Sequence, residues 1–439
     1  MVKELFLYLS LVSVLHPAAW TKIEPADTIL PPGRYGHSSC YLPDQNGIFI
    51  YAGCDGSKAY LGDAWIFYLD SLVWRNATPP TQNPRPRNFP AVCYMASMGK
   101  IFMFGGREGD DPPVPYNDTW YYDLAVMAWE SVAVGVSPRP RNSPGCAYDP
   151  LGNRVVIFGG WSPSYAWYPF LDDLWLFYPD SESWDSVPKT TPWPRGRATG
   201  TLVYDPLEHR MILFGGIYFD TVSQQYKLLR DSWALDLATL AWDSLEVTNL
   251  QFVPPYYDHG AVFDAPRNRM LVYGGGASQS DEVWSLDMVE MNWQKVPTPG
   301  PTPGEWRMAP WVANTACKFA YLFSGQPTNP PPQDLWAFDM SITGISENTP
   351  DKPGLSLSVS PNPAKGQVRI SLSEEGAYSL RLYDAAGRMV RELGQEQKGG
   401  QPERVTLTSF VWVPDVPSGI YFLRLEAGGK ALTEKLVIK

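Results

Sequence analysis

Short apolar runs alternate with polar turns along most of this chain. Four such runs recur in each of five units and three in a sixth. In the third unit they cover 145–148, 154–158, 174–178 and 183–187. The runs are four or five residues long, and turn-forming Pro, Gly, Asn and Asp separate them. This pattern is typical of short β-strands joined by turns, and it favours an all-β protein over one built from long helices.

A pair of Gly residues, or the remnant of one, closes the second apolar run of each unit. The six pairs are Ala52-Gly53, Gly105-Gly106, Gly159-Gly160, Gly215-Gly216, Gly274-Gly275 and Ser324-Gly325. Their spacing gives a period of 50 to 59 residues. Four strands at such a period describe one blade of a β-propeller. Because one sheet of this kind cannot bury both of its faces alone, we expect six blades stacked in a ring.

Three further positions recur at fixed distances from the Gly pair. An Asp and then a Trp follow it: Asp63/Trp65, Asp118/Trp120, Asp173/Trp175, Asp231/Trp233, Asp281/Trp284 and Asp334/Trp336. A second Trp follows in five units, at Trp74, Trp129, Trp184, Trp242 and Trp293. An Arg precedes the second Gly by 18 or 19 residues, at Arg34, Arg87, Arg141, Arg197 and Arg307, and Tyr256 takes its place in the fifth unit.

The repetition itself favours structural roles for these residues. We expect each repeated Asp to accept hydrogen bonds from the backbone at the start of a strand, rather than to bind calcium. We expect each repeated Arg to anchor the boundary between neighbouring sheets, rather than to line a shared anion site. The repeated Trp side chains are expected to lie in the core.

The sixth unit stops after its third strand, at Asp339, and no fourth-strand Trp follows it. The missing piece lies at the other end of the chain, because Ala19-Trp20-Thr-Lys-Ile-Glu-Pro25 matches the fourth strand Met291-Asn-Trp293-Gln-Lys-Val-Pro297. We therefore predict that the N-terminal strand completes the sixth sheet and closes the ring. Such closure removes an open sheet edge that would invite aggregation.

The Gly pair, the Asp-x-Trp, the second Trp and the preceding Arg resemble the kelch-repeat family. A bacterial variant with a Tyr-Asp-Pro…Arg hairpin is similar to residues 148–154 and 204–210 of this chain. The resemblance implies a six-bladed kelch-type β-propeller over residues 20–345. The chain departs from the pattern at the lost first Gly of units one and six, at Tyr256, and at a one-residue insertion between Asp281 and Trp284.

The first 19 residues have the pattern of a secretory signal peptide. One Lys precedes an apolar run at 5–15, and small residues follow it. A membrane span needs about 20 apolar residues, so this run is too short, and no later segment is apolar enough to span a bilayer. A buried N-terminal strand is the alternative. Cleavage near Ala19 would leave the closing strand at the mature N-terminus.

Beyond a polar, Pro-containing linker at 346–353 the repeat stops. Apolar and polar residues alternate at 367–372 and 378–383, with turn residues between them. This alternation predicts a small Ig-like antiparallel β-sandwich over residues 354–439.

Four segments of this C-terminal domain resemble the type A sorting domain of the bacterial type IX secretion system. They contain Pro361, Asn362, Pro363, Gly387, Gly419, Tyr421 and Lys435. The resemblance implies that the type IX machinery is a partner, and that the protein passes through the periplasm and is secreted or held on the outer cell surface. A generic Ig-like domain with a binding role is the alternative.

Composition excludes several classes of protein. Of the 439 residues, 44% are hydrophobic and 18% are charged, which is too apolar for a disordered chain. The net charge of −11 fits poorly with nucleic acid as a partner, because that needs a basic surface. The five Cys residues are odd in number and show no CxxC or Cys/His ligand spacing. We expect them to be small buried residues rather than disulfides or metal ligands.

Catalytic motifs are absent from the sequence. His37 and His259 occupy the same place in two units, where packing or a strand hydrogen bond is the expected role. Neither the His, Tyr and Cys set of a galactose oxidase copper site, nor the Asp box of sialidases, nor a Ser/His/Asp order is found. We therefore predict no catalytic residue, no metal and no cofactor. The rival interpretation is a glycan-active hydrolase or lyase that uses acids such as Asp110, Asp111 and Asp172.

Twelve of the 18 Trp residues belong to the repeated strand positions, which leaves a surplus in the loops. In a blade whose strands run up-down-up-down, the loops between strands 2 and 3 and from strand 4 to the next blade open on one face, here called the loop face. It carries the longest loops, 107–117, 161–172 and 217–230. Its candidate ligand-binding residues are Arg107, Trp161, Tyr165, Trp167, Trp193, Tyr218 and Trp306.

Flat aromatic rings beside polar groups suit a sugar or a protein partner. Long loops on a rigid scaffold are also where function concentrates. We therefore predict a secreted or cell-surface, non-catalytic protein that offers the loop face to a glycan or protein ligand. Two alternatives stay open: the aromatic side chains only hold the long loops down by packing, or the protein is a purely structural surface protein.

Overall fold

The structure is a computed structural model that describes residues 19–342 except 111, 164–168, 255, 276–280, 305–307 and 327. Toward the C-terminus it describes 356–360, 368–374, 378–384, 388–396, 406–412, 414, 416–427 and 430–438. The chain forms two compact units, Met1–Ser346 and Glu347–Lys439. The predicted signal peptide (1–19, apart from Ala19) and linker (346–353) lie outside the described residues, so both stay predictions.

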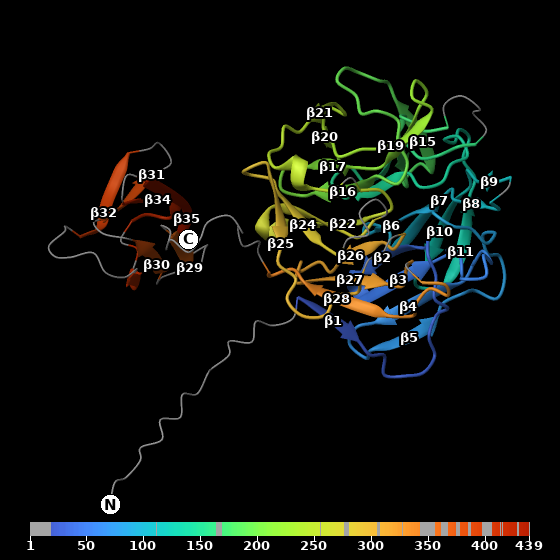
Figure 1. Ribbon diagram of the computed structural model, residues 1–439, viewed down its shortest axis with the longest axis horizontal. Coiled ribbons are helices and arrows are strands. Elements are labelled where there is room, and N and C mark those ends of the chain that lie inside the picture. The colour runs from blue at the N-terminus through green and yellow to red at the C-terminus, as the bar shows by residue number, and fades with distance from the viewer. Residues whose placement is uncertain are drawn as a thin grey trace, which may run out of the picture. The chain divides into compact units, whose positions relative to one another are not determined.

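Residues 20–339 contain six open, four-stranded antiparallel sheets, one for each sequence unit (Figure 1). Sheet 1 contains β2 (Ser38–Leu42), β3 (Gly47–Tyr51), β4 (Ala64–Tyr68) and β5 (Val73–Asn76); sheet 2 contains β6 (Ala91–Met95), β7 (Lys100–Phe104), β10 (Thr119–Asp123) and β11 (Ala128–Val132). Sheet 3 contains β12 (Gly145–Asp149), β13 (Arg154–Phe158), β14 (Leu174–Tyr178) and β15 (Ser183–Val187).

The other three sheets have the same order of strands 1 to 4. Sheet 4 contains β16 (Thr201–Asp205), β17 (Arg210–Phe214), β20 (Ser232–Asp236) and β21 (Trp242–Ser244); sheet 5 contains β22 (Gly260–Asp264), β23 (Arg269–Tyr273), β24 (Val283–Asp287) and β25 (Asn292–Val296). Sheet 6 contains β26 (Trp311–Ala313), β27 (Phe319–Phe323), β28 (Leu335–Asp339) and β1 (Trp20–Ile23). Short 3-10 turns lie at η1 (Pro43–Gln45), η2 (Leu250–Phe252) and η3 (Ala265–Arg267).

The N-terminal strand β1 is the outer strand of sheet 6. It pairs antiparallel with β28, and Trp20 lies opposite Phe338. The backbone N–H of Asp339 donates to the carbonyl of Ala19, and the N–H of Ala19 donates to the carbonyl of Pro299, both at 2.9 Å. The sheet whose own unit lacks a fourth strand therefore obtains one from the N-terminus.

Neighbouring sheets contact one another through their first strands. These contacts run in the order β2, β6, β12, β16, β22 and β26, and β26 contacts β2 again. The second Gly of a unit also donates its N–H to the carbonyl of the Arg of the next unit, as from Gly53 to Arg87 (2.8 Å). The same bond joins Gly325 of the sixth unit to Arg34 of the first (2.9 Å). This arrangement is consistent with a kelch-type propeller.

The core lies between neighbouring sheets, and the Trp of the fourth strand is its largest component. These six side chains are buried: Trp20, Trp74, Trp129, Trp184, Trp242 and Trp293. The ring of Trp129 in sheet 2, for example, lies 4.6 Å from the ring of Tyr51 in sheet 1, centroid to centroid. The core role predicted for these Trp residues is confirmed.

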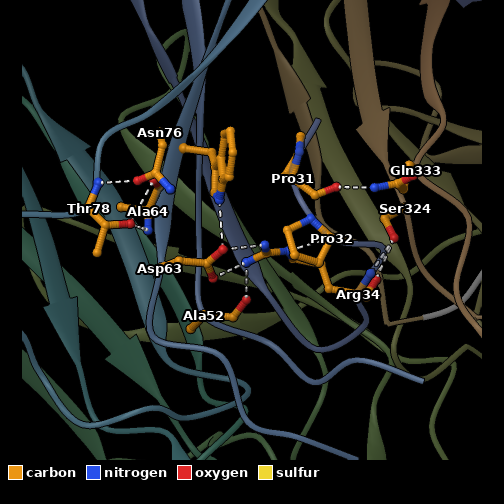
Figure 2. A network of polar contacts seen from close by, with 11 residues as sticks. Pro31, Pro32, Arg34, Ala52, Asp63, Ala64, Asn76, Thr78, Ser324 and Gln333 are labelled. Atoms are coloured by element: carbon orange, nitrogen blue, oxygen red, sulfur yellow. Dashed lines mark hydrogen bonds and ion pairs between the residues drawn. The ribbon is translucent and has the colours of Figure 1, made fainter. Parts of the chain in front are cut away.

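A buried Arg, an Asp and a Trp are bonded to one another in four of the sheets. In sheet 3, Arg141 donates to both carboxylate oxygens of Asp173 (2.6 and 2.8 Å) and to the carbonyl of Gly159 (2.8 Å). The indole N–H of Trp175 donates to the same carboxylate (2.7 Å). The other three groups are Arg34/Asp63/Trp65, Arg87/Asp118/Trp120 and Arg197/Asp231/Trp233. Figure 2 shows the Arg34 guanidinium against Asp63 and the carbonyl of Ala52.

These bonds correct the prediction that the repeated Asp residues mainly accept backbone hydrogen bonds, because the principal donors are the Arg and Trp side chains. The Arg141 side chain is 0% exposed, whereas Asp173 keeps 31% exposure. Burial opposes the ionisation of Asp173, but the hydrogen bonds and charge of Arg141 outweigh it, so the pKa of this carboxyl is lowered. The boundary position predicted for the repeated Arg is confirmed where the structure describes it, because its backbone carbonyl bonds to the preceding sheet.

The fifth unit departs from this arrangement. Tyr256 stands in the place of the Arg, and its buried hydroxyl has no hydrogen-bond partner among the described residues. Asp281 accepts a hydrogen bond from Thr302 (2.8 Å), and the indole N–H of Trp284 donates to Glu282 (3.0 Å). The prediction that paired Asp281 with Trp284 across an insertion is therefore wrong, since Glu282 keeps the acid-x-Trp spacing.

A second kind of buried ion pair closes the hairpin between strands 1 and 2. In sheet 3, Asp149 at the end of β12 is 0% exposed and accepts a hydrogen bond from Arg154 at the start of β13 (2.9 Å). The pair recurs in sheets 4 and 5 as Asp205/Arg210 and Asp264/Arg269. These pairs explain the Tyr-Asp-Pro…Arg pattern of the sequence.

The cysteines behave largely as small apolar side chains. All five thiols are free, and Cys40, Cys54 and Cys93 are buried, while Cys146 and Cys317 are partly exposed. Burial raises the pKa of the Cys40 and Cys54 thiols above its usual range. The predicted role as buried residues is therefore confirmed for three of the five.

Two buried histidines predict that stability depends on pH. His37 and His259 are 4% and 6% exposed, and burial lowers the pKa of each from 6.5 to about 3. Below about pH 6.5 the unfolded chain binds protons at these side chains and the folded protein does not, so stability falls as pH falls. We expect a loss of about 1 kcal/mol for each histidine between pH 6 and pH 5.

Urea denaturation at the two pH values measures this difference. The variant His37→Gln should reduce the difference by about half, because one of the two titrating groups is removed. An equal free energy of unfolding at both pH values would contradict the neutral, buried state of these histidines.

The C-terminal unit contains two antiparallel sheets. One has the strands β29 (Ser356–Ser360), β30 (Val368–Glu374) and β33 (Thr406–Trp412). The other has the order β32 (Met389–Glu396), β31 (Tyr378–Asp384), β34 (Gly419–Ala427) and β35 (Lys430–Ile438). The alternation predicted at 367–372 falls in β30 from residue 368 on, and that at 378–383 falls in β31. Alternate residues of two central strands are unexposed, namely Leu380, Leu382, Leu423 and Leu425, as in strands with one buried face.

Candidate binding site

Two hairpins and one long loop shape the loop face at sheets 2, 3 and 4. β8 (Arg107–Glu108) pairs with β9 (Val114–Pro115) in the long loop of sheet 2, and β18 (Ile217–Asp220) pairs with β19 (Gln225–Leu228) in that of sheet 4. In sheet 3, the backbone of Trp161 forms bridges to Asn142 and to Phe170. The predicted long loops are therefore held by backbone pairing at their described residues.

A cavity of about 790 Å³ opens between the loops of sheets 3 and 4. Residues from three segments line it: 169–172 of sheet 3, 189–196 between sheets 3 and 4, and 218–222 of the β18–β19 hairpin. All three segments belong to loops that were predicted to open on the loop face. The volume is typical of a small-molecule site, which takes about 300–1,000 Å³.

Trp193 lines the cavity and is held firmly by its neighbours. Its indole N–H donates to the backbone carbonyl of Asp172 (2.7 Å). Its ring packs against Phe158 and Trp242, at centroid distances of 6.5 and 6.4 Å. The carboxylate of Asp172 in turn pairs with Lys189 (2.6 Å). Trp193 therefore has both roles that were considered for the loop aromatic residues: it holds a loop in place by packing, and it lines the cavity.

Arg195 stacks on Tyr218 in the lining of the same cavity. The guanidinium carbon lies 4.3 Å from the ring centroid, within the range of a cation–π contact. Arg195 is exposed and forms no ion pair with any residue that the structure describes. Asp220 accepts hydrogen bonds from the N–H of Val222 and the hydroxyl of Ser223, both at 3.0 Å, and the first of these is the main cause of the lowered pKa of its carboxyl.

A second polar cluster on the loop face joins sheets 1, 2 and 3. The guanidinium of Arg107 lies 5.8 Å from the ring centroid of Trp161 and 3.6 Å from the carboxylate of Asp110. The hydroxyl of Tyr60 donates to the same carboxylate (2.7 Å). Burial and this hydrogen bond raise the pKa of Tyr60, so its hydroxyl stays protonated.

The structure brings the predicted ligand-binding residues together in two places. Trp193 and Tyr218 line the cavity, and Arg107 and Trp161 contact each other in the second cluster. The remaining three residues lie outside the described part of the chain: Tyr165, Trp167 and Trp306.

Two cations line the cavity that the aromatic pattern of the sequence does not indicate, Lys189 and Arg195. A signal for the second of them is present, because Arg-x-Arg recurs at 85–87, 139–141 and 195–197. The residue between the two Arg side chains is Pro in the first two copies and Gly196 in the third. Unit one also has Gly directly before its repeated Arg, at Gly33, so this Gly does not by itself mark the cavity.

Two of the three acids that were named for a rival enzyme form ion pairs or hydrogen bonds with neighbouring side chains. Asp110 is bound to Tyr60 and Arg107, Asp172 is bound to Lys189, and Asp111 lies outside the described residues. Within the described ranges, no three His, Cys, Asp or Glu side chains are grouped so as to hold a metal ion.

Three of the predicted sorting residues lie in the four-stranded sheet of the C-terminal unit. Gly419 and Tyr421 belong to β34, and Lys435 belongs to β35. The buried Tyr421 donates its hydroxyl proton to the carbonyl of Pro417 (2.8 Å). The other four lie outside the described residues: Pro361, Asn362, Pro363 and Gly387. Among the helices of the described residues, none is long and apolar enough to cross a membrane.

Comparisons with known families divide the chain into nearly the same two parts as the structure does. The family model described as the KLHDC2/KLHL20/DRC7 Kelch-repeats domain matches residues 8–216 and 203–358. The secretion system C-terminal sorting domain matches residues 358–439. The sorting domain indicates export from a bacterium, either to the cell surface or as a secreted protein.

Similarity to curated proteins is limited to part of their length. Host cell factor 1 of Homo sapiens is 23% identical over 301 residues, which cover 62% of this chain and 14% of that protein. Host cell factor of Drosophila melanogaster is 26% identical over 263 residues, or 54% of this chain and 17% of that protein. Adagio protein 3 of Arabidopsis thaliana is 24% identical over 310 residues, which cover 66% of this chain and 47% of that protein. The chain thus spans less than half the length of each of these relatives.

Proposed function

This chain belongs to the kelch-repeat family, and on that premise we propose that it is a secreted or cell-surface, non-catalytic protein that binds a glycan on its loop face. One observation carries the proposal: the cavity of about 790 Å³ between the loops of sheets 3 and 4. Trp193 and Tyr218 line it beside Thr190 and Thr191. A sugar fits such a lining, because its ring has an apolar face and its edge carries hydroxyl groups.

The proposal includes a closed ring of six blades. The contact of β26 with β2, and the bond from Gly325 to Arg34, support closure between the sixth and the first sheet. The pairing of β1 with β28 supports closure by the N-terminal strand. In such a ring all loops of the loop face open to the same side.

The proposed domain limits follow from the same reasoning. They are a signal peptide at 1–19, the propeller at 20–345, a linker at 346–353 and the sorting domain at 354–439. The two antiparallel sheets of the C-terminal unit support an Ig-like sandwich. Handling by the type IX machinery is implied by the sorting domain.

A protein partner is the competing ligand, because kelch repeats suggest a protein-binding propeller. The cavity favours a small ligand, since a stable protein interface spreads over roughly 800 Å² of surface on each partner. A glycan-active enzyme is the other alternative, and it would show turnover that is lost when Asp110 or Asp172 is replaced.

The variant Tyr218→Ala tests the proposed function. We expect the mature full chain to bind a subset of glycans on an array, and the variant to bind the same glycans at least about tenfold more weakly, as for a central aromatic contact. Tyr218 belongs to the small β18–β19 hairpin, outside the six four-stranded sheets, so the melting temperature should stay within about 1 °C of the parent. Trp161→Ala in the second cluster shows whether the binding surface extends toward sheet 2.

The matched control is Leu151→Ala. Leu151 is 72% exposed in the hairpin between strands 1 and 2 of sheet 3, away from the loop face. It should leave binding unchanged. Unaltered affinity in Tyr218→Ala, or hydrolysis of a bound glycan, would show that the proposed function is wrong.

A further inference from the structure

The charged side chains that line the cavity differ in whether they have a hydrogen-bond or ion-pair partner. Lys189 and Asp172 neutralise each other at 2.6 Å. Asp220 accepts two hydrogen bonds within its own turn and is open to water. Arg195 pairs with no carboxylate among the described residues, so it is the cation that the cavity offers to a ligand.

Tyr218 limits the directions in which Arg195 can donate. The guanidinium carbon lies 4.3 Å from the ring centroid. A guanidinium held over a ring by a cation–π contact still has N–H donors directed away from the ring, and two of them match the two oxygens of a carboxylate. Lys227 lies opposite Tyr218 in the register of β18 and β19, so it adds a positive charge on the same side of the hairpin.

Gly196 decides how closely one wall of the cavity approaches Arg195. The equivalent residue is Gly33 in unit one, Pro86 in unit two and Pro140 in unit three. A Cβ atom at Gly196 would lie 2.5 Å from the carbonyl oxygen of Phe170, which is closer than real Cβ contacts. Only Gly therefore lets the Phe170 wall of the cavity approach the segment that carries Arg195.

Resting on the proposed glycan-binding function, we propose that the cavity selects saccharides that carry a carboxylate, and that Arg195 binds this carboxylate. A uronic acid satisfies the lining as a whole: its ring lies against the aromatic side chains, its hydroxyl groups reach Thr190 and Thr191, and its carboxylate reaches the edge of the guanidinium. A neutral sugar leaves the exposed charge of Arg195 without a partner.

Isothermal titration of the mature full chain tests the inference with defined probes. The probes are oligogalacturonides and fragments of alginate and hyaluronan, each beside its carboxyl-reduced, neutral form. We expect at least one acidic probe to bind about tenfold or more tightly than its reduced form. Arg195→Gln should remove this preference, so that the acidic probe loses about tenfold in affinity relative to its neutral form.

The matched control is Arg139→Gln. Arg139 occupies the place of Arg195 one unit earlier, and it does not line the cavity. Its replacement should change neither affinity. The variant Arg195→Lys should retain part of the preference, because it keeps the charge but loses the two parallel donors.

The outcomes separate the inference from the function on which it rests. Equal affinity for the acidic and reduced forms, or an unchanged preference in Arg195→Gln, would overturn the role of Arg195. Binding of neutral glycans only would also overturn the role of Arg195, but it would leave the proposed glycan-binding function intact. Failure of every saccharide to bind, acidic or neutral, overturns both.

Discussion

Replacing Asp173 with Ala is expected to lower the free energy of unfolding by about 3 to 5 kcal/mol, because it leaves the charge of Arg141 buried without a partner. The Arg141 side chain is 0% exposed and donates to both oxygens of the Asp173 carboxylate. Its remaining acceptors are the carbonyls of Gly159 and Arg139, which carry no net charge. The indole N–H of Trp175 loses its acceptor as well.

Urea denaturation, followed by Trp fluorescence, measures this effect. The control is Asp281→Ala, because Asp281 directly precedes the acid-x-Trp of the fifth unit, where Tyr256 replaces the repeated Arg, and among the described residues it accepts from Thr302 alone (2.8 Å). We expect this control to change the free energy of unfolding by no more than about 0.5 kcal/mol. Similar small losses in both variants would show that the buried pair does not hold sheet 3.

The strands were predictable because each unit repeats the same physical requirements. A short sheet must bury both faces against its neighbours, so apolar runs, turns and Trp positions return at one period. In sheet 3 all four strands begin at the predicted residues, and only β12 extends one residue further, to Asp149. Asp149 belongs to the strand because its ion pair with Arg154 closes the hairpin.

The Arg–Asp pairing was missed although the sequence contains a signal for it. The two series keep a nearly constant separation, from 29 residues in Arg34/Asp63 to 34 in Arg197/Asp231. They also fail together, because the fifth unit has Tyr256 in place of the Arg and loses the Asp-x-Trp spacing at Asp281. Two repeated positions that depart in the same unit are candidates for direct contact.

The loop face was predictable from strand connectivity, but the cavity was not. Connectivity alone decides which loops share a face, so Trp193 and Tyr218 were correctly grouped. The cavity depends on how closely two loops approach, and this distance is set by the missing Cβ of Gly196 against Phe170. Arg195 meets the Tyr218 ring because these two loops lie close together. The positions of the aromatic residues in the sequence do not indicate this contact.

Replacing Trp20 with Ala should lower the free energy of unfolding by about 3 to 5 kcal/mol, the range observed when a buried Trp is truncated. Trp20 is 0% exposed. Its ring lies 4.6 Å from Tyr273, 5.7 Å from Trp311 and 5.0 Å from Phe338, centroid to centroid. Tyr273 belongs to sheet 5, so the same side chain both attaches β1 to sheet 6 and packs against the neighbouring sheet.

The size of this loss tests whether the N-terminal strand holds the fold together. Lys22→Ala is the matched control on β1: Lys22 is 41% exposed and pairs with Asp334 (2.9 Å) at the surface, so its replacement should cost no more than about 1 kcal/mol. Both variants are measured by urea denaturation of the mature chain. If Trp20→Ala costs no more than Lys22→Ala, β1 is dispensable, and the join between the sixth and first sheets rests on the contact of β26 with β2 and on the bond from Gly325 to Arg34. A loss of the expected size means instead that β1 stabilises the sixth sheet and its packing against the fifth, as the proposed closure by the N-terminal strand requires.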